Sequence, residues 1–363
     1  MRLDAWKGLN LTDRQFVTVT LDTSAASSDT EQQVRLRWEA AHQSLQDAGA
    51  PERLLQVVGA RFITRDRPVT GHGRCVVAAS ADGDPPEVVL DQDLPESPAD
   101  SASFAPVPDL LPIVRAGQRH PPHLRVDLDR TGADIAIHGV LGEHLGTRSV
   151  TGQHDVIHKV RAGEASEQRL QRRAEDSWER NAADVGRALE KLSAQYDPSL
   201  IAVAGDVRAV AALQAHSTER VRRLLTVLET GGRAAGTDPT ARAAAVRRAL
   251  DATVVAEVEE AVARLFQAEG RQDRAAQGSD EVEAAFDRGQ VDTLLLADPP
   301  LDRTRAAWLL AAALQTDAVV VLVPPELSLP EGAAAVLRWN DPATPHDSGP
   351  SMPGHGEQPG WQP

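Results

Sequence analysis

The sequence has a single cysteine and few aromatic residues, and both shortages limit what the chain can be. Cys75 cannot form an internal disulfide, and a four-cysteine zinc site is excluded. Aromatic residues make up 3% of the chain, so aliphatic and alanine side chains must fill its cores. No segment approaches the roughly 20 apolar residues of a transmembrane helix, and the first residues lack the apolar region of a secretory signal. These absences predict a protein of the reducing cytoplasm, with no membrane partner.

Charge is distributed unevenly along the 363 residues, whose formal net charge is -15. Residues 1–114 carry 10 Lys+Arg and 17 Asp+Glu, residues 115–249 carry 21 and 17, and residues 250–363 carry 7 and 19. This balance argues against a general DNA- or RNA-coating protein. If RNA is a partner, we expect the cationic middle to contact it and the acidic ends to face protein or solvent. Almost all of the cations are arginine, which suits phosphate and base contacts.

The first part of the chain is predicted to be an α/β unit. Residues 16–22 (FVTVTLD) and 74–80 (RCVVAAS) have the composition of strands. Apolar residues recur every three or four positions in 31–48, which predicts a helix. Residues 91–109 are rich in Pro, Asp and Ser and are expected to form a surface loop.

A hairpin and a long helix are predicted next. Two alternating runs, 123–129 and 133–138, flank the turn sequence Arg130-Thr131-Gly132. No periodicity is evident in 139–165, and a helix is then expected over 166–195, with Ser166 as its N-cap. Its apolar stripe consists of Leu170, Ala174, Trp178, Ala182, Val185, Leu189 and Leu192.

The remaining elements complete a prediction of the α/β fold class with three α/β domains. Asp238-Pro239 has the pattern of an N-cap followed by the first helical residue. The expected helices are 217–229, 240–268, 280–289 and 303–315, and the expected strands are 199–204, 292–297, 317–323 and 335–339. The predicted domains are 1–115, 120–237 and 238–340, followed by a disordered tail at 341–363.

Searches for catalytic motifs give mostly negative results. No P-loop sequence and no GxSxG motif are present. The GGRAAG segment at 231–236 follows a helix rather than a strand, so a helix end and linker is favoured over a phosphate loop. His154 and His158 have helical ligand spacing but lack a third ligand. Cys75 is expected to be a small core residue. The sequence therefore predicts no cofactor, no metal site and no visible active site.

One basic segment stands apart from this background. Residues 158–180 (HKVRAGEASEQRLQRRAEDSWER) join a basic, glycine-containing loop to an arginine-rich helix. The heptad spacing of Arg173, Arg180 and Arg187 keeps these three on nearly one side of that helix. A loop held at the end of such a helix suits insertion into a narrow cavity lined by RNA. The alternative is a solvated helix with local Arg–Asp ion pairs, and the near balance of charge over 158–191 favours it on this stripe alone.

The order of features resembles a known family. In chain order there are the loop, the arginine-rich helix, the strand ending in Gly205-Asp206, the Gly-Gly linker, and an α/β unit with DRGQVDTLLLAD and GAAAVLRW. These features resemble the archaeal/eukaryotic peptide-chain release factor one and Pelota family. They look more like its bacterial branch, which includes the ribosome hibernation factor Balon. The resemblance covers about residues 120–340, and residues 1–115 look like the N-terminal domain of that branch. No equivalent of the eukaryotic stop-codon-reading motif is present.

The resemblance also locates a candidate site. The family's catalytic Gly-Gly-Gln corresponds to the stretch 161–166, in which Gly163 is retained and Glu164 stands in place of the glutamine. An anion beside rRNA phosphates and a developing oxyanion is unfavourable, so Glu164 is a catalytic candidate only if hydrolysis takes place. Ala162 also restricts the backbone. The resemblance implies that the rRNA-binding residues are His158, Lys159, Arg161, Gly163, Arg169, Arg172, Arg173 and Arg180.

Three functional hypotheses follow. The first is a cytoplasmic factor that occupies the A site of idle 70S ribosomes without reading a codon, with elongation factor Tu as a further partner implied by the resemblance. The second is a peptidyl-tRNA hydrolase that rescues stalled ribosomes. The third is a stress-linked interaction protein that never meets the ribosome, which the acidic ends and the lack of catalytic residues would allow.

Overall fold

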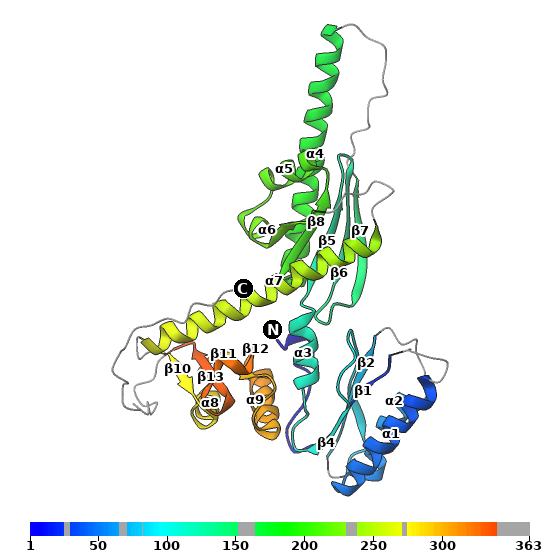
Figure 1. The fold of residues 1–363 in the computed structure, drawn as a ribbon, viewed down its shortest axis with the longest axis vertical. Coiled ribbons are helices and arrows are strands. Elements are labelled where there is room, and N and C mark those ends of the chain that lie inside the picture. Colours follow the sequence, from blue (N-terminus) through cyan, green and yellow to red (C-terminus); the bar gives the residue numbers. More distant parts are fainter. Residues whose placement is uncertain are drawn as a thin grey trace.

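The computed structural model describes residues 1–24, 30–64, 71–81, 83–151, 164–229, 238–270 and 274–339, with the backbone alone for Thr30 and 164–177. Within these residues the fold is mixed α/β and contains three separate sheets, so the predicted α/β class is confirmed (Figure 1). The strands of each sheet come from one continuous part of the chain. The predicted tail at 341–363 lies outside the described residues, and the predicted domain boundaries stay predictions.

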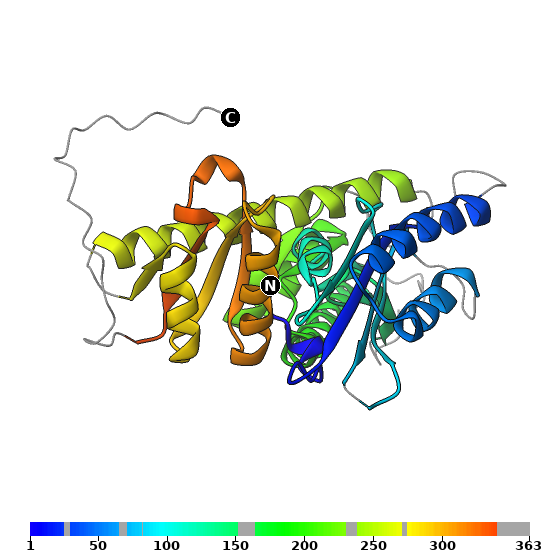
Figure 2. The same ribbon diagram turned by 90° about the horizontal axis from the view of Figure 1, so that it is seen from below.

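The first sheet is antiparallel with the order β3-β2-β1-β4. Its strands are β1 (Gln15–Asp22), β2 (Gly73–Ser80), β3 (Glu87–Leu94) and β4 (Ser101–Ala105). Helices α1 (Thr30–Asp47) and α2 (Glu52–Ile63) cover one face, where Trp38 stacks on Phe62 with ring centroids 6.0 Å apart. Figure 2 shows both helices on the side of this sheet that is remote from the third sheet.

The prediction of a surface loop at 91–109 is wrong. Residues 91–94 continue β3, which pairs with β2, and β4 pairs with β1. The charged residues of β3 are compatible with a strand because Arg74 of β2 binds Asp91, with Nε–Oδ1 and Nη2–Oδ2 distances of 2.7 Å. Residues 91–109 are rich in polar residues because β3 and β4 are partly exposed edge strands, and this composition does not exclude a strand.

The second sheet has the order β7-β6-β5-β8-β9. Its strands are β5 (His123–Leu128), β6 (Gly132–His138), β7 (His144–Thr151), β8 (Leu200–Gly205) and β9 (Leu225–Val227). The hairpin of β5 and β6 is confirmed, and β8 runs parallel to β5. Helices α4 (Glu164–Tyr196), α5 (Val207–Ala215) and α6 (Glu219–Leu224) cover one face.

Two local predictions for this sheet are wrong. α4 begins at Glu164, so Ser166 lies inside the helix rather than at its N-cap, because Glu164 and Ala165 are strong helix formers. The helix expected over 217–229 ends at Leu224, and Leu225–Val227 pair with β8 as a parallel strand.

The third sheet has the order β10-β13-β11-β12. Its strands are β10 (Ala275–Gln277), β11 (Val291–Ala297), β12 (Val319–Val323) and β13 (Ala333–Leu337), and β11 is parallel to β12. Helices α8 (Ser279–Asp287) and α9 (Arg303–Thr316) cover one face. Short 3-10 turns occur at Asp4–Trp6, Pro325–Leu327 and Pro330–Gly332.

Two helices join the sheets. α7 (Pro239–Gly270) packs its first half on the second sheet through Val246 and Leu250, and its second half on the third sheet through Ala261 and Leu265. The predicted N-cap is confirmed, because Asp238 Oδ1 accepts a hydrogen bond from Thr240 N at 2.9 Å.

The short helix α3 (Leu111–Arg119) belongs to a core that also includes residues of the first and third sheets. The Gln118 amide of α3 donates to Leu322 O of β12 and accepts from Leu322 N, both at 2.7 Å. α3 therefore occupies the outer edge of the third sheet, and the first and third sheets share one hydrophobic interior.

Candidate functional site

The residues predicted to contact rRNA fall into three groups. The loop residues lie outside the described part of the chain: His158, Lys159, Arg161 and Gly163. Glu164 is the first residue of α4, and the structure describes only the backbone there and at the next group, Arg169, Arg172 and Arg173. Arg180 has a described side chain and is exposed. The assignment of these residues to RNA contact stays a prediction.

α4 is much longer than its contact with the second sheet requires. It has 33 residues. Among its described side chains, which start at Trp178, burial begins at Asn181 and continues through Val185, Leu189 and Leu192, which confirms this part of the predicted apolar stripe. The preceding residues 164–177, which we call the arm, would span about 21 Å at 1.5 Å per residue. Figure 1 shows the arm projecting beyond the strands of the second sheet.

The heptad positions keep the basic residues of α4 away from the sheet. Arg180 and Arg187 are both exposed, whereas Val185 and Leu189 are buried against the strands. Arg173 lies two helical turns before Arg180, so its backbone position falls on nearly the same side. Arg187 pairs with Asp184 on its own helix. The local pairing expected for a solvated helix therefore occurs here, while the predicted pairs of Asp176 involve side chains that the structure does not describe.

A cluster of polar and aromatic side chains fixes the base of the arm. The Arg130 guanidinium lies 4.5 Å from the ring centroid of Trp178, the first residue after the arm. Asn181 Nδ2 donates to Arg130 O at 3.0 Å, and Arg130 Nη2 lies 3.1 Å from Asp206 Oδ2. Cation–π and charge-assisted contacts of this kind hold their partners in a defined orientation. The hairpin turn, α4 and the start of α5 therefore meet at Arg130.

The sequence explains why these residues meet. Asp129 Oδ1 accepts hydrogen bonds from Thr131 N at 2.7 Å and Gly132 N at 2.9 Å, which closes the turn. A Cβ at position 132 would lie 1.9 Å from Val150 O, so only glycine fits. Asp206 caps α5 through Arg208 N and Ala209 N. Partial desolvation raises the pKa of Asp206, but hydrogen bonds from Arg130 and from these amides outweigh that effect and lower it.

The second sheet and its helices also carry exposed cations that form no ion pair with another described residue. On the helices and the edge strand of the second sheet, four exposed cations form no ion pair with another described residue, and none of them was singled out from the sequence. They are Arg148 of β7, Lys191 of α4, Arg208 of α5 and Arg223 of α6. Arg220 and Arg222 are instead paired with Asp197 and Glu219. These four side chains can therefore attract a polyanion without first breaking an ion pair with another described residue.

No catalytic centre is evident in the described part of the chain. Among those residues, no group of three His, Cys, Asp or Glu could hold a metal ion, and no helix has the length and apolar character needed to cross a membrane. Burial raises the pKa of the Cys75 thiol to about 12. Cys75 is therefore the core residue that was predicted, and it is unsuited to act as a nucleophile.

The base cluster was missed by sequence reasoning because Arg130 and Trp178 are far apart in the chain. One signal was available. Gly205-Asp206 after a buried strand has the pattern of a strand end followed by an N-cap, which places a carboxylate at the end of β8, next to the hairpin turn.

Comparison with known proteins identifies the segment that carries the arm. Residues 122–271 match the model of bacterial archaeo-eukaryotic release factor family 2. The Mycobacterium tuberculosis (strain H37Rv) protein named "Uncharacterized protein Rv2629" is 26% identical over 309 residues, covering 82% of this chain and 79% of that protein. Among solved structures, a ribosome-bound archaeal Pelota in a model with ABCE1 has 16% identity and a TM-score of 0.41 and covers 90% of each chain. Dom34 of S. cerevisiae has 13% identity and a TM-score of 0.39, covering 69% of this chain and 77% of that one.

The predicted family resemblance is confirmed by the family match, which includes β5 to β9 and α4 to α7. Over residues 122–271 the chain is similar to bacterial archaeo-eukaryotic release factor family 2.

Proposed function

We propose that this release-factor-like chain binds the 70S ribosome and occupies the A site of idle ribosomes without reading a codon, in the manner of the hibernation factor Balon. The observation that carries the proposal is the arm, which projects from the segment that matches the family and continues into a helix with exposed arginines. Exposed cations of the second sheet that form no ion pair with another described residue would add to the attraction that an RNA-lined site requires.

The distribution of charge supports one orientation on the ribosome. The arm would approach the peptidyl-transferase region, and the first sheet would lie toward the decoding centre. The acidic residues 250–363 would be repelled by rRNA and would face protein, for which elongation factor Tu is the candidate. A cytoplasmic location belongs to the same proposal.

Co-sedimentation with 70S ribosomes in sucrose gradients tests this proposal. We expect the protein to migrate with ribosomes from stationary-phase cells and to dissociate steeply as salt rises. Replacing Arg169, Arg172 and Arg173 together with glutamine should weaken binding. The slope of log affinity against log salt should fall by about 2 to 3, because each phosphate that is no longer neutralised removes somewhat less than one unit.

A matched variant controls for the removal of three charges. Arg264, Arg305 and Arg338 lie on or beside the acidic third sheet, and their replacement with glutamine changes the net charge by the same amount. We expect this variant to keep the salt slope of the unmodified protein. Protein that stays at the top of the gradient at low salt, or equal effects of the two triple variants, would contradict the proposal.

Peptidyl-tRNA hydrolysis is the alternative function. It would require Glu164 to act as a base where the family uses glutamine, next to rRNA phosphates and a developing oxyanion, which is electrostatically unfavourable. We therefore expect no release of labelled peptide when saturating protein is added to ribosomes carrying peptidyl-tRNA. Release that is abolished by Glu164→Ala would favour the hydrolase over the hibernation factor.

A further inference from the structure

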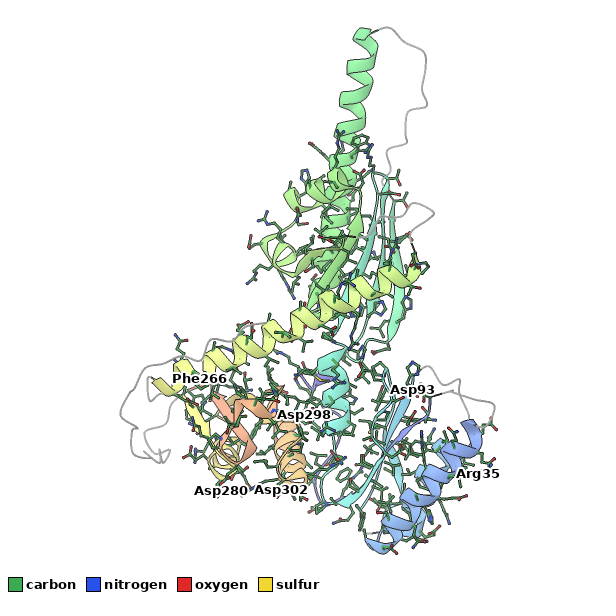
Figure 3. All side chains as sticks on the ribbon, in the orientation of Figure 1. Arg35, Asp93, Phe266, Asp280, Asp298 and Asp302 are labelled. Atoms are coloured by element: carbon green, nitrogen blue, oxygen red, sulfur yellow. The ribbon has the colours of Figure 1, made fainter. Side chains whose placement is uncertain are left out.

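A cavity of about 420 Å³ lies where the first sheet, α3 and the third sheet meet. The loop between β3 and β4 forms one wall, α3 forms a second, and the turn after β11 together with the start of α9 forms a third. Figure 3 shows Asp298, in that turn, between α9 and α3. The volume falls within the usual range for sites that bind small molecules.

Arginine is the dominant charged residue of this cavity, although the whole chain is strongly acidic. Arg115 and Arg119 come from α3 and Arg303 is the first residue of α9, whereas the lining contains only Glu96 and Asp298 as carboxylates. The rest of the lining is mainly apolar or proline: Leu94, Pro98, Pro112, Ala116 and Pro299. The cavity thus offers guanidinium groups on one part of its wall and flat apolar surface on another.

Each of the three arginines is held by a carboxylate that leaves part of its guanidinium unused. The pairs are Arg115 Nε–Asp298 Oδ1 (2.8 Å), Arg119 Nη1–Glu96 Oε2 (2.9 Å) and Arg303 Nε–Asp109 Oδ2 (2.7 Å). A guanidinium has five N–H donors, and these contacts occupy one or two nitrogen atoms of each group. The remaining nitrogens have no partner among the described residues, so the carboxylates orient the guanidinium groups and leave donors for another anion.

The position in the third sheet is also typical of a ligand site. β11 and β12 are parallel, and Asp298 and Pro299 directly follow the carboxyl end of β11. Ligands of open α/β sheets bind outside the carboxyl ends of the strands. Guanidinium groups match the geometry of phosphate oxygens, and the proline and leucine side chains of the lining offer apolar surface beside them.

We propose that this cavity binds a small phosphate-bearing molecule with a ring portion, of the nucleoside diphosphate class. The phosphates contact Arg119 and Arg303, and the ring lies against the proline and leucine side chains. Because the walls belong to both the first and the third sheet, such a ligand ties these two parts of the chain together. The arm plays no part in this site.

Isothermal titration calorimetry of the intact free protein at low salt tests the proposal, with ADP, GDP, inorganic pyrophosphate and adenosine as probes. We expect ADP or GDP to bind more tightly than pyrophosphate, and adenosine to bind more weakly than ADP. Arg303→Ala should weaken nucleotide binding about tenfold or more, because it removes a charge-assisted contact. Arg119→Ala should act in the same direction, and its side chain is 63% exposed, so the variant is expected to fold.

Arg305 provides a matched control two residues further along α9. Its side chain is 42% exposed, pairs with Asp280 and lies outside the cavity, so Arg305→Ala should leave nucleotide affinity unchanged. The absence of binding heat with both nucleotides would overturn the proposal. Equal effects of Arg303→Ala and Arg305→Ala would also overturn it, as would equal affinity for pyrophosphate and ADP. The measurement needs no ribosome, so its outcome is independent of the proposed function.

Discussion

The carboxylate of Glu96 links the first sheet to α3 and α7 through hydrogen bonds. Its removal should therefore lower the free energy of unfolding. Its carboxylate accepts hydrogen bonds from Arg119 Nη1 at 2.9 Å, His120 Nε2 at 2.9 Å and Arg247 Nη2 at 3.0 Å. Burial lowers the pKa of His120 despite the neighbouring carboxylate, so its imidazole is neutral at pH 7. Neutral His120 donates to Glu96 through Nε2, and Arg247 Nη1 lies 3.3 Å from His120 Nδ1 and 3.1 Å from His120 Nε2.

The pKa of Glu96 gives the size and the pH range of this contribution. Desolvation raises the pKa, but the hydrogen bonds from its three partners outweigh it and lower the pKa from 4.5 to about 2. At about 1.4 kcal/mol per pKa unit the shift corresponds to at most about 3 kcal/mol. The side chain is 37% exposed, so solvent screening reduces the expected contribution to about 1 to 2 kcal/mol. Because the folded-state pKa is depressed, this stabilisation is present above pH 4.5 and is lost as the pH falls toward 2.

Urea unfolding of Glu96→Gln measures this contribution. At pH 7 we expect the free energy of unfolding to fall by about 1 to 2 kcal/mol, and the difference from the unmodified protein to shrink as the pH is lowered below 4.5. Glu87→Gln is the control, because Glu87 lies in β3, the strand that precedes Glu96, but is 65% exposed, with Arg14 3.5 Å away. A Glu96→Gln variant as stable as the control at pH 7, or a stability difference that does not depend on pH, would refute the reasoning.

Two further predictions concern the base of the arm and the core of the first sheet. Arg130→Ala should lower the free energy of unfolding by about 1 to 2 kcal/mol, because it removes a cation–π contact with Trp178 and a partly exposed ion pair. Urea unfolding measures this loss. Arg130→Lys keeps the charge without the planar group and should recover part of the stability. Cys75 should not react with Ellman's reagent in the native protein, because burial raises its pKa to about 12, and should react fully in concentrated guanidinium chloride. Rapid modification of the native thiol would contradict the burial of this strand.

Elements with strong local patterns could be predicted from the sequence. The hairpin of β5 and β6 was evident from alternation around Arg130-Thr131-Gly132, and the start of α7 from Asp238-Pro239. β3 and β4 were missed because their polar residues are balanced by partners elsewhere, such as Arg74 opposite Asp91. Local periodicity indicates which side of an element is apolar, and it contains no information about charge partners contributed by other strands.

The parts of the site that depend on distant residues could not be predicted. Arg130 and Asp206 are 76 positions apart, and Arg115 and Asp298 are 183 positions apart. Their contacts depend on how the sheets and α3 pack against one another. No short segment of the sequence indicates this packing. The arginine positions of the arm were predictable, because they depend on composition and helical spacing alone.

The arm and the described part of the acidic residues 250–363 lie in different parts of the fold, and the charge distribution makes this separation relevant to RNA binding. A chain of net charge -15 is repelled by RNA at long range, so attraction must come from a local region that enters first. Under the proposed function this region would be the second sheet with its projecting arm, because residues 115–249 are the part of the chain in which Lys+Arg (21) exceed Asp+Glu (17). α7 extends from this sheet to the third sheet, so the most acidic part of the chain is held beside the second sheet rather than around the arm. Under the proposed function, approach to RNA in any other orientation would bring carboxylates against phosphates, so the acidic regions would select one orientation of binding and the arginines would supply its affinity.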